Sequence, residues 1–171
     1  MPAPIICPRR VVEREWIDYN GHMNVAYYGL VFDQALDHVL DGLGIGTAYV
    51  RERQCSLFTV ETHVHFISEL AEGDPLRVEY RLLDWDDKRL HSFGEMYHAT
   101  QNYLAATSEQ LSLHIAMAAR KAVAFPDDVE RRIGAAIRDH LRLPWPGRAG
   151  KVVGIPAAKS RSAEWRLRDH G

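Results

Sequence analysis

Residues 16–43, which read WIDYNGHMNVAYYGLVFDQALDHVLDGL, restrict the fold of this chain more than any other stretch does. A turn-forming segment, DYNG, leads to Asn24, a favoured N-cap residue, and the helix-compatible run after it ends at Gly42. The polar residues of that run recur at spacings of three and four and so form one narrow stripe: Asp33, Gln34, Asp37, His38 and Asp41. A helix that is apolar around the rest of its circumference must be covered by other elements. The stretch therefore predicts a buried helix with a carboxylate, Asp18, in the turn before its positive end.

The sequence after this helix predicts a series of antiparallel strands. Residues 49–68 and 76–85 both alternate between apolar and polar positions, as half-buried strands do. In the first of them the alternation puts five residues on one face: Phe58, Val60, Thr62, Val64 and Phe66. A polar connection at residues 86–88 predicts a hairpin to residues 90–100, strands at residues 103–118 and 119–125 follow, and residues 9–17 suit a first strand. One helix that is apolar almost all round needs a strongly curved antiparallel sheet around it, so the predicted fold class is α+β.

The rest of the chain predicts a second helix and a tail. Pro126, Asp127 and Asp128 open a helical stretch with an acidic first turn, as the helix dipole favours. From residue 143 the composition shifts to Pro, Gly, Ala, Lys, Arg and Ser. We therefore expect one domain over residues 1–142 and an irregular tail over residues 143–171, for which Trp165 offers an anchor.

Composition and charge exclude several classes of protein. A net charge of −2 and a pI near 6.5 give no reason to expect nucleic acid or a membrane surface as a partner. No run approaches the roughly 18 apolar residues of a membrane span. The first residues, MPAPIICPRR, reverse the order of a signal peptide, and Cys7 and Cys55 lack C-x-x-C or zinc spacing, so we expect a cytoplasmic protein. There is no G-x-S-x-G elbow or phosphate-binding loop, and we expect no cofactor.

A short motif within the opening stretch resembles a known family. D-x-x-G-H-x-N at Asp18, Gly21, His22 and Asn24, followed by G-D-x-L-x-V at residues 73–78, resembles the hot-dog fold of the 4-hydroxybenzoyl-CoA thioesterase group over residues 11–129. Residues 59–66 (TVETHVHF), 86–93 and 106–114 are similar to the thioesterases of carnitine catabolism, which hydrolyse betainyl-CoA to betaine and CoA. One departure is that relatives often end the last of these strands with HVD, whereas Ile115 and Ala116 follow His114 here.

The resemblance implies roles for residues around the turn. Asp18 takes the position of the family's acid, which acts either as nucleophile or as general base, although an aspartate there can also simply cap a turn. The backbone N–H that polarises the thioester carbonyl falls on Val25. Asn24 is either an N-cap or a substrate contact, and His22 either orients the acid or the thioester or is a hydrogen-bonded turn residue.

Recognition of a betainyl group would depend on aromatic faces, because a quaternary ammonium donates no hydrogen bond. Trp16, Tyr19 and Tyr28 are the candidates near the turn, although aromatic residues there are often core, and Tyr27 and Trp85 are also available. Glu61 and His63 are secondary substrate-binding candidates, and with His65 they share a strand face that could bind a metal. The resemblance requires no metal, and we expect none.

The phosphates of coenzyme A call for cations and suggest Lys88 and Arg89, or alternatively Arg120 and Lys121, although short basic pairs are often solvated surface. The expected partner is a CoA thioester substrate. The family pairs its exposed sheet edges, which implies a homodimer or homotetramer. Two alternatives remain open: a thioesterase for another short, fatty or aromatic acyl-CoA, and a non-catalytic acyl-CoA-binding regulator.

Overall fold

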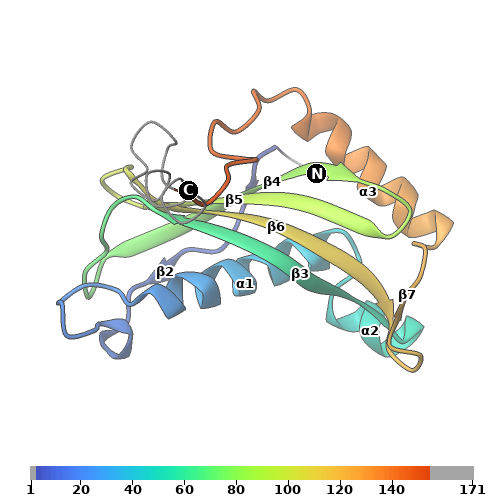
Figure 1. Ribbon diagram of the computed structural model, residues 1–171, viewed down its shortest axis with the longest axis horizontal. Coiled ribbons are helices and arrows are strands. Elements are labelled where there is room, and N and C mark those ends of the chain that lie inside the picture. Colours follow the sequence, from blue (N-terminus) through green and yellow to red (C-terminus); the bar gives the residue numbers. More distant parts are fainter. Residues whose placement is uncertain (1–2, 155–171) are drawn as a thin grey trace, which may run out of the picture.

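A curved antiparallel sheet wraps around one long helix in the computed structural model, which describes residues 3–154 (Figure 1). The long strands are β3 (Cys55–Phe66), β4 (Pro75–Trp85), β5 (Arg89–His98) and β6 (Leu104–Ala116). Two-residue strands β1 (Ile5–Ile6) and β2 (Arg10–Val11) pair with β4, and β7 (Lys121–Ala122) pairs with β6. The strand order is β1-β4-β5-β6-β3, and the predicted α+β class is confirmed.

The helix α1 (Val25–Gly42) lies against the concave face of the sheet (Figure 1). It begins where predicted, because the Asn24 side chain accepts a hydrogen bond from the Ala26 N–H at 3.0 Å. Phe32 and Val39 are fully buried, and the Tyr80 hydroxyl of β4 donates to the Phe32 carbonyl at 3.0 Å. The sheet thus covers one apolar face of α1 and the polar stripe faces outward, but coverage is not complete, because Val25 and Leu30 are 60% and 39% exposed.

The prediction of a strand over residues 9–17 is wrong. Only the two residues of β2 pair with β4, and a 3₁₀ turn, η1 (Arg14–Trp16), follows. In this turn the Trp16 N–H donates to the Glu13 carbonyl at 3.0 Å, and the indole is 4% exposed. Burial of this large side chain outweighs the β-propensity of the segment.

The predicted strand over residues 49–68 begins six residues late. Its first part is the helix α2 (Thr47–Arg53), whose Tyr49 is buried and hydrogen-bonds His114 at 2.9 Å. Gln54 ends this helix in the left-handed conformation, with φ 52°. Propensity favoured a strand there, but burial of Tyr49 against β6 holds the segment helical.

A β-bulge in β3 also overturns the predicted face of Phe58. The register against β6 shifts between Thr59 and Glu61. Leu57 before the shift and Val64 after it both pack against the core, although their spacing is odd. One extra residue reverses the alternation, so Phe58 lies on the convex side.

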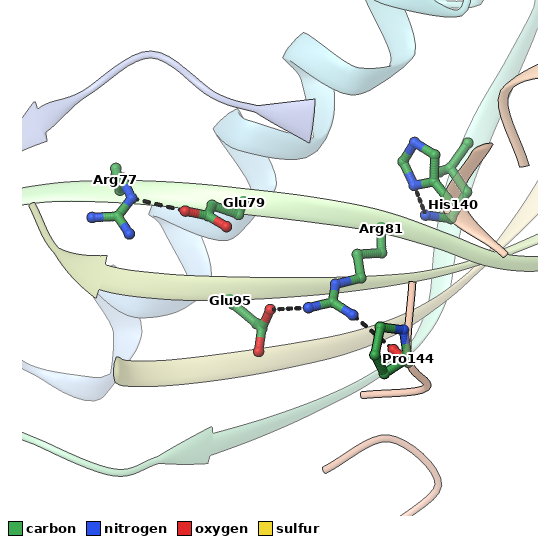
Figure 2. A network of polar contacts seen from close by, with 7 residues as sticks. Arg77, Glu79, Arg81, Glu95, His140 and Pro144 are labelled. Carbon is green, nitrogen blue, oxygen red and sulfur yellow. Dashed lines mark hydrogen bonds and ion pairs between the residues drawn. The ribbon is translucent and has the colours of Figure 1, made fainter. Parts of the chain in front are cut away.

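The helix α3 (Asp127–His140) packs along β4 beyond β1, where the His140 Nδ1 accepts the Leu82 N–H at 2.9 Å (Figure 2). Residues 143–154 contain no helix or strand and cross the convex face. Arg81 donates to the Pro144 carbonyl at 2.8 Å, and the Gly150 N–H donates to Glu109 at 2.7 Å. The proposed anchor Trp165 lies outside the described residues. No helix within residues 3–154 is both long and apolar enough to cross a bilayer.

Candidate functional site

A tight turn places Asp18 just before α1. Its backbone N–H donates to the His22 carbonyl at 3.1 Å, and its carbonyl accepts the Gly21 N–H at 3.0 Å. Gly21 has φ 82°, a conformation that residues with a Cβ rarely adopt, which explains the glycine in the motif. An isolated bridge between Ile17 and Met23 closes the turn. The motif therefore fixes the backbone that carries the acid.

Asn24 joins the carboxylate of Asp18 to the start of the helix. Its Oδ1 caps Ala26, and its Nδ2 lies 3.4 Å from Asp18 Oδ2. The other carboxylate oxygen, Asp18 Oδ1, accepts the Asn20 N–H at 2.8 Å. One asparagine thus makes both contacts, so the capping role is observed and Asn24 also holds the candidate acid.

The first N–H of α1, that of Val25, has no hydrogen-bond acceptor among residues 3–154. Such an N–H points outward at the end of the helix where its dipole is positive. Val25 is 60% exposed, so a carbonyl oxygen can reach this group. The position suits a donor to a developing oxyanion.

This helix start opens on a cavity of about 320 Å³ between α1 and the segment that follows β3. Its lining residues are His22, Met23, Val25, Tyr28, Phe66, Ile67, Ser68 and Glu69. The structure therefore brings His22, Val25 and Tyr28 together at one cavity, and Asp18 does not line it but contacts Asn24, the residue before Val25. The ring of Tyr28 is 4% exposed, and burial raises its pKa to about 12.

Two aromatic residues that were predicted to contact the substrate lie away from the cavity at Val25. Trp16 is buried, with its ring stacked on Tyr27 at a centroid distance of 5.6 Å and the Arg10 guanidinium 5.7 Å from its centroid. Tyr19 is 97% exposed at the tip of the turn. Neither residue lines the cavity at Val25.

Glu61 and His63 line a different cavity, of about 460 Å³, on the convex face of the sheet. It also includes Trp85, Arg89 and the carboxylate of Glu109, which His91 contacts at 2.9 Å. In a single protomer the sheet thus separates these two candidates from Asp18. No group of three His, Cys, Asp or Glu side chains within residues 3–154 is arranged to hold a metal ion.

The predicted CoA-binding pair is engaged in ion pairs. The Arg89 guanidinium contacts the Asp86 carboxylate at 2.5 Å, and Lys88 lies 3.6 Å from Asp87. The hydrogen bond from Arg89, with help from backbone N–H groups, lowers the pKa of Asp86 to about 2. A phosphate would have to compete with these carboxylates for both cations.

The sequence reasoning did not select Phe66 and Glu69 as site residues. Phe66 was assigned only to a strand face, and Glu69 lies in an irregular segment without a motif. Both reach the site through contacts distant in sequence, such as the edge-on packing of Phe66 against Tyr28 at 5.2 Å. No local pattern could have indicated them.

Comparison with known proteins agrees with this geometry. Residues 12–133 match the thioesterase-like superfamily. The chain belongs to this family. The expected hot-dog fold, the expected class of thioester hydrolase and the resemblance to betainyl-CoA thioesterases are therefore confirmed.

Individual relatives add detail. The betainyl-CoA thioesterase of Pseudomonas aeruginosa is 36% identical over 145 residues, which are 85% of this chain and 91% of that protein. An L-carnitine dehydrogenase/betainyl-CoA thioesterase of a Rhizobium species is 41% identical over 84% of this chain, which spans only 29% of that longer protein. A Staphylococcus aureus protein solved in complex with CoA has a TM-score of 0.83 and 29% identity, covering 91% of this chain and 98% of that one.

Proposed function

We propose that this thioesterase hydrolyses betainyl-CoA to betaine and CoA. The proposal is supported by the names of the similar proteins, of which one matches over 91% of its own length. The structural observation that carries it is the Val25 N–H at the head of α1, which has no acceptor among the described residues and is linked through Asn24 to a carboxylate. A CoA thioester is the expected substrate class for such a pair of groups.

Asp18 would promote the attack on the thioester carbonyl carbon, and the Val25 N–H would stabilise the carbonyl oxygen. As nucleophile, the Asp18 carboxylate bonds to the thioester carbonyl carbon, the C–S bond breaks and CoA leaves as a thiolate, and water then hydrolyses the mixed anhydride and restores the carboxylate. As general base, Asp18 takes a proton from the water that attacks the same carbon, the C–S bond breaks, and the CoA thiolate leaves and takes up that proton. In both routes negative charge develops on the carbonyl oxygen, and the Val25 N–H stabilises it with the helix dipole.

Release of free thiol tests the proposal directly. The purified chain is offered betainyl-CoA beside acetyl-, butyryl- and benzoyl-CoA, and kcat/KM is measured for each. We expect betainyl-CoA to be the best substrate. Preference for benzoyl- or butyryl-CoA would instead assign an aromatic or fatty acyl substrate, and the absence of thiol release from all four would indicate a binding protein.

We also propose that the working unit is at least a homodimer that pairs through β3. This strand ends the strand order of the sheet, and no residue of it is buried. Phe58 and Val60 are 37% and 55% exposed, and pairing through this edge would remove such apolar surface from water. Light scattering should give a dimer or tetramer for the unaltered chain and a monomer for Val60→Lys.

A cytoplasmic location completes the proposal. Both cysteines are free, Cys7 being buried and Cys55 half-buried, as is usual in a reducing compartment. Cell fractionation with an antibody to the chain would check it, and recovery in a periplasmic fraction would contradict it.

A further inference from the structure

We propose that Glu69, together with the rings of Tyr28 and Phe66, selects the cationic acyl group of the substrate. The proposal rests on betainyl-CoA as the substrate and assigns the residues that distinguish it from an uncharged acyl-CoA. All three residues line the cavity into which the Val25 N–H opens.

The chemistry of the acyl group determines where its recognition must occur. In a betainyl thioester the quaternary nitrogen is only two bonds from the carbonyl carbon. A carbonyl oxygen held by the Val25 N–H therefore leaves the trimethylammonium group inside the same cavity. The convex-face cavity with Glu61 and His63 lies across the sheet, and Trp16 is buried beneath Tyr27, so these residues cannot contact the cation in the same protomer.

Glu69 supplies the opposite charge. It is the one carboxylate among the described residues that line the cavity, and no cation within residues 3–154 pairs with it. Its negative charge is close enough to Tyr28 to contribute to the raised pKa of that hydroxyl, after the larger effect of burial. A carboxylate without an ion-pair partner beside an apolar wall suits an organic cation.

The backbone of Glu69 is held on both sides. The Tyr103 hydroxyl donates to the Glu69 carbonyl at 3.0 Å, and the preceding Ser68 N–H donates to Ala105 of β6 at 3.0 Å. The next carbonyl, that of Leu70, accepts the Met23 N–H at 2.7 Å, within the turn that carries Asp18. The backbone that carries the acid is thus fixed relative to the head of α1, which helps to position a short substrate.

Tyr28 and Phe66 supply the aromatic faces. Their ring centroids are 5.2 Å apart and their planes meet at 82°, so they form a corner in the cavity wall. Tyr28 is 4% exposed and is held in place by packing, whereas Phe66 is 53% exposed and free to meet a ligand. A quaternary ammonium binds to ring faces and a nearby charge, since it has no hydrogen to donate.

The test compares two substrates of the same shape. The carbon isostere of betainyl-CoA is 3,3-dimethylbutyryl-CoA, which replaces the charged nitrogen with carbon. We expect the unaltered chain to prefer betainyl-CoA and Glu69→Gln to lower that preference, the ratio of the two kcat/KM values, about fivefold, the effect of a partly exposed ion pair. Phe66→Leu should lower it about threefold by removing one ring face.

Glu72→Gln is the matched control, because Glu72 lies on the same loop but pairs with Arg14 at 3.3 Å and does not line the cavity. Its substrate preference should equal that of the unaltered chain.

If Glu69→Gln keeps the full preference, or if Glu61→Gln abolishes it instead, the assignment of Glu69 is overturned while betainyl-CoA hydrolysis stands. If the unaltered chain hydrolyses both thioesters equally well, the charge is not recognised and the inference alone fails. If it does not hydrolyse betainyl-CoA at all, the proposed function fails and the inference fails with it.

Discussion

Replacement of Asn24 by aspartate separates the two contacts that this side chain makes at the head of α1. The cap to the Ala26 N–H survives, because aspartate is an equally good N-cap and its charge suits the helix dipole. The contact at 3.4 Å to Asp18 changes from a donated hydrogen bond to a repulsion between two carboxylates. The variant therefore perturbs the acid with little effect on the helix.

The size of this effect follows from the distance. Two unit charges 3.4 Å apart repel by about 1 kcal/mol in bulk water and by about 5 kcal/mol at an effective dielectric constant of 20. Both side chains are half-buried, so the lower part of this range applies, about 1–2 kcal/mol. Since one pH unit corresponds to about 1.4 kcal/mol, the acid limb of the pH profile of kcat/KM should move up by about one pH unit.

The assay follows loss of the thioester over a range of pH for the unaltered chain, Asn24→Asp and Asn24→Ser. Serine keeps the cap and adds no charge, so its acid limb should stay in place and its melting temperature should match that of the aspartate variant. Asn24→Ala should melt about 2–4 °C lower, because loss of a cap costs about 1 kcal/mol. An acid limb of Asn24→Asp that coincides with that of the unaltered chain would show that the carboxylate controlling the rate is not the neighbour of Asn24, and the role of Asp18 would be refuted.

Three further substitutions test the site and the core. Asp18→Asn should lower kcat by about 10²–10⁴-fold with an unchanged circular dichroism spectrum, and near-normal turnover would remove the catalytic assignment. Burial, followed by the charges of Asp33 and Asp41, raises the pKa of Asp37. The folded state therefore binds this proton more tightly than the unfolded state does. Stability falls as pH rises from the pKa of the unfolded state through that of the folded state. Asp37→Asn should consequently raise the melting temperature by about 2 °C at pH 7 and leave it unchanged at pH 3, and an equal gain at both pH values would contradict the charge argument. Gly94→Ala would place a Cβ 2.9 Å from the Tyr80 ring and 3.0 Å from Phe32, and the overpacking should lower the melting temperature by about 5 °C, whereas an unchanged value would mean that both rings can move.

The parts of the fold that could be predicted from the sequence are those that local residues specify. The turn from Asp18 to Asn24 needs only its own hydrogen bonds and one glycine with positive φ, so its motif identifies it. The helix after it has a local cap and a continuous polar stripe, and it begins at Val25 as expected. The strands β4 to β6 alternate regularly over most of their length and pair as predicted.

The remaining features depend on contacts that no local pattern contains. The helix over Thr47–Arg53 forms because Tyr49 packs and hydrogen-bonds against His114, which lies 65 residues further on. The bulge after Thr59 adds one residue to β3 and moves Phe58 to the other face, although the alternation is unbroken in the sequence. Glu69 reaches the cavity because Tyr103 and Met23, both distant in sequence, bind the carbonyls of Glu69 and Leu70. Such positions are defined by the folded chain as a whole.

The segment after α3 determines how two copies of this domain could stack. Directly packed sheets lie about 10 Å apart, a gap that their own side chains fill. Here Arg81 binds the Pro144 carbonyl and Glu95 together (Figure 2). Glu109 also binds Gly150, so a length of main chain already occupies part of the convex face. Two dimers could meet back to back only after displacing it, which would cost Arg81 and Glu109 these contacts with the main chain. A tetramer that keeps these contacts would have to join through another surface; at the outward stripe of α1, for example, the acidic residues would require cations or basic side chains between the helices.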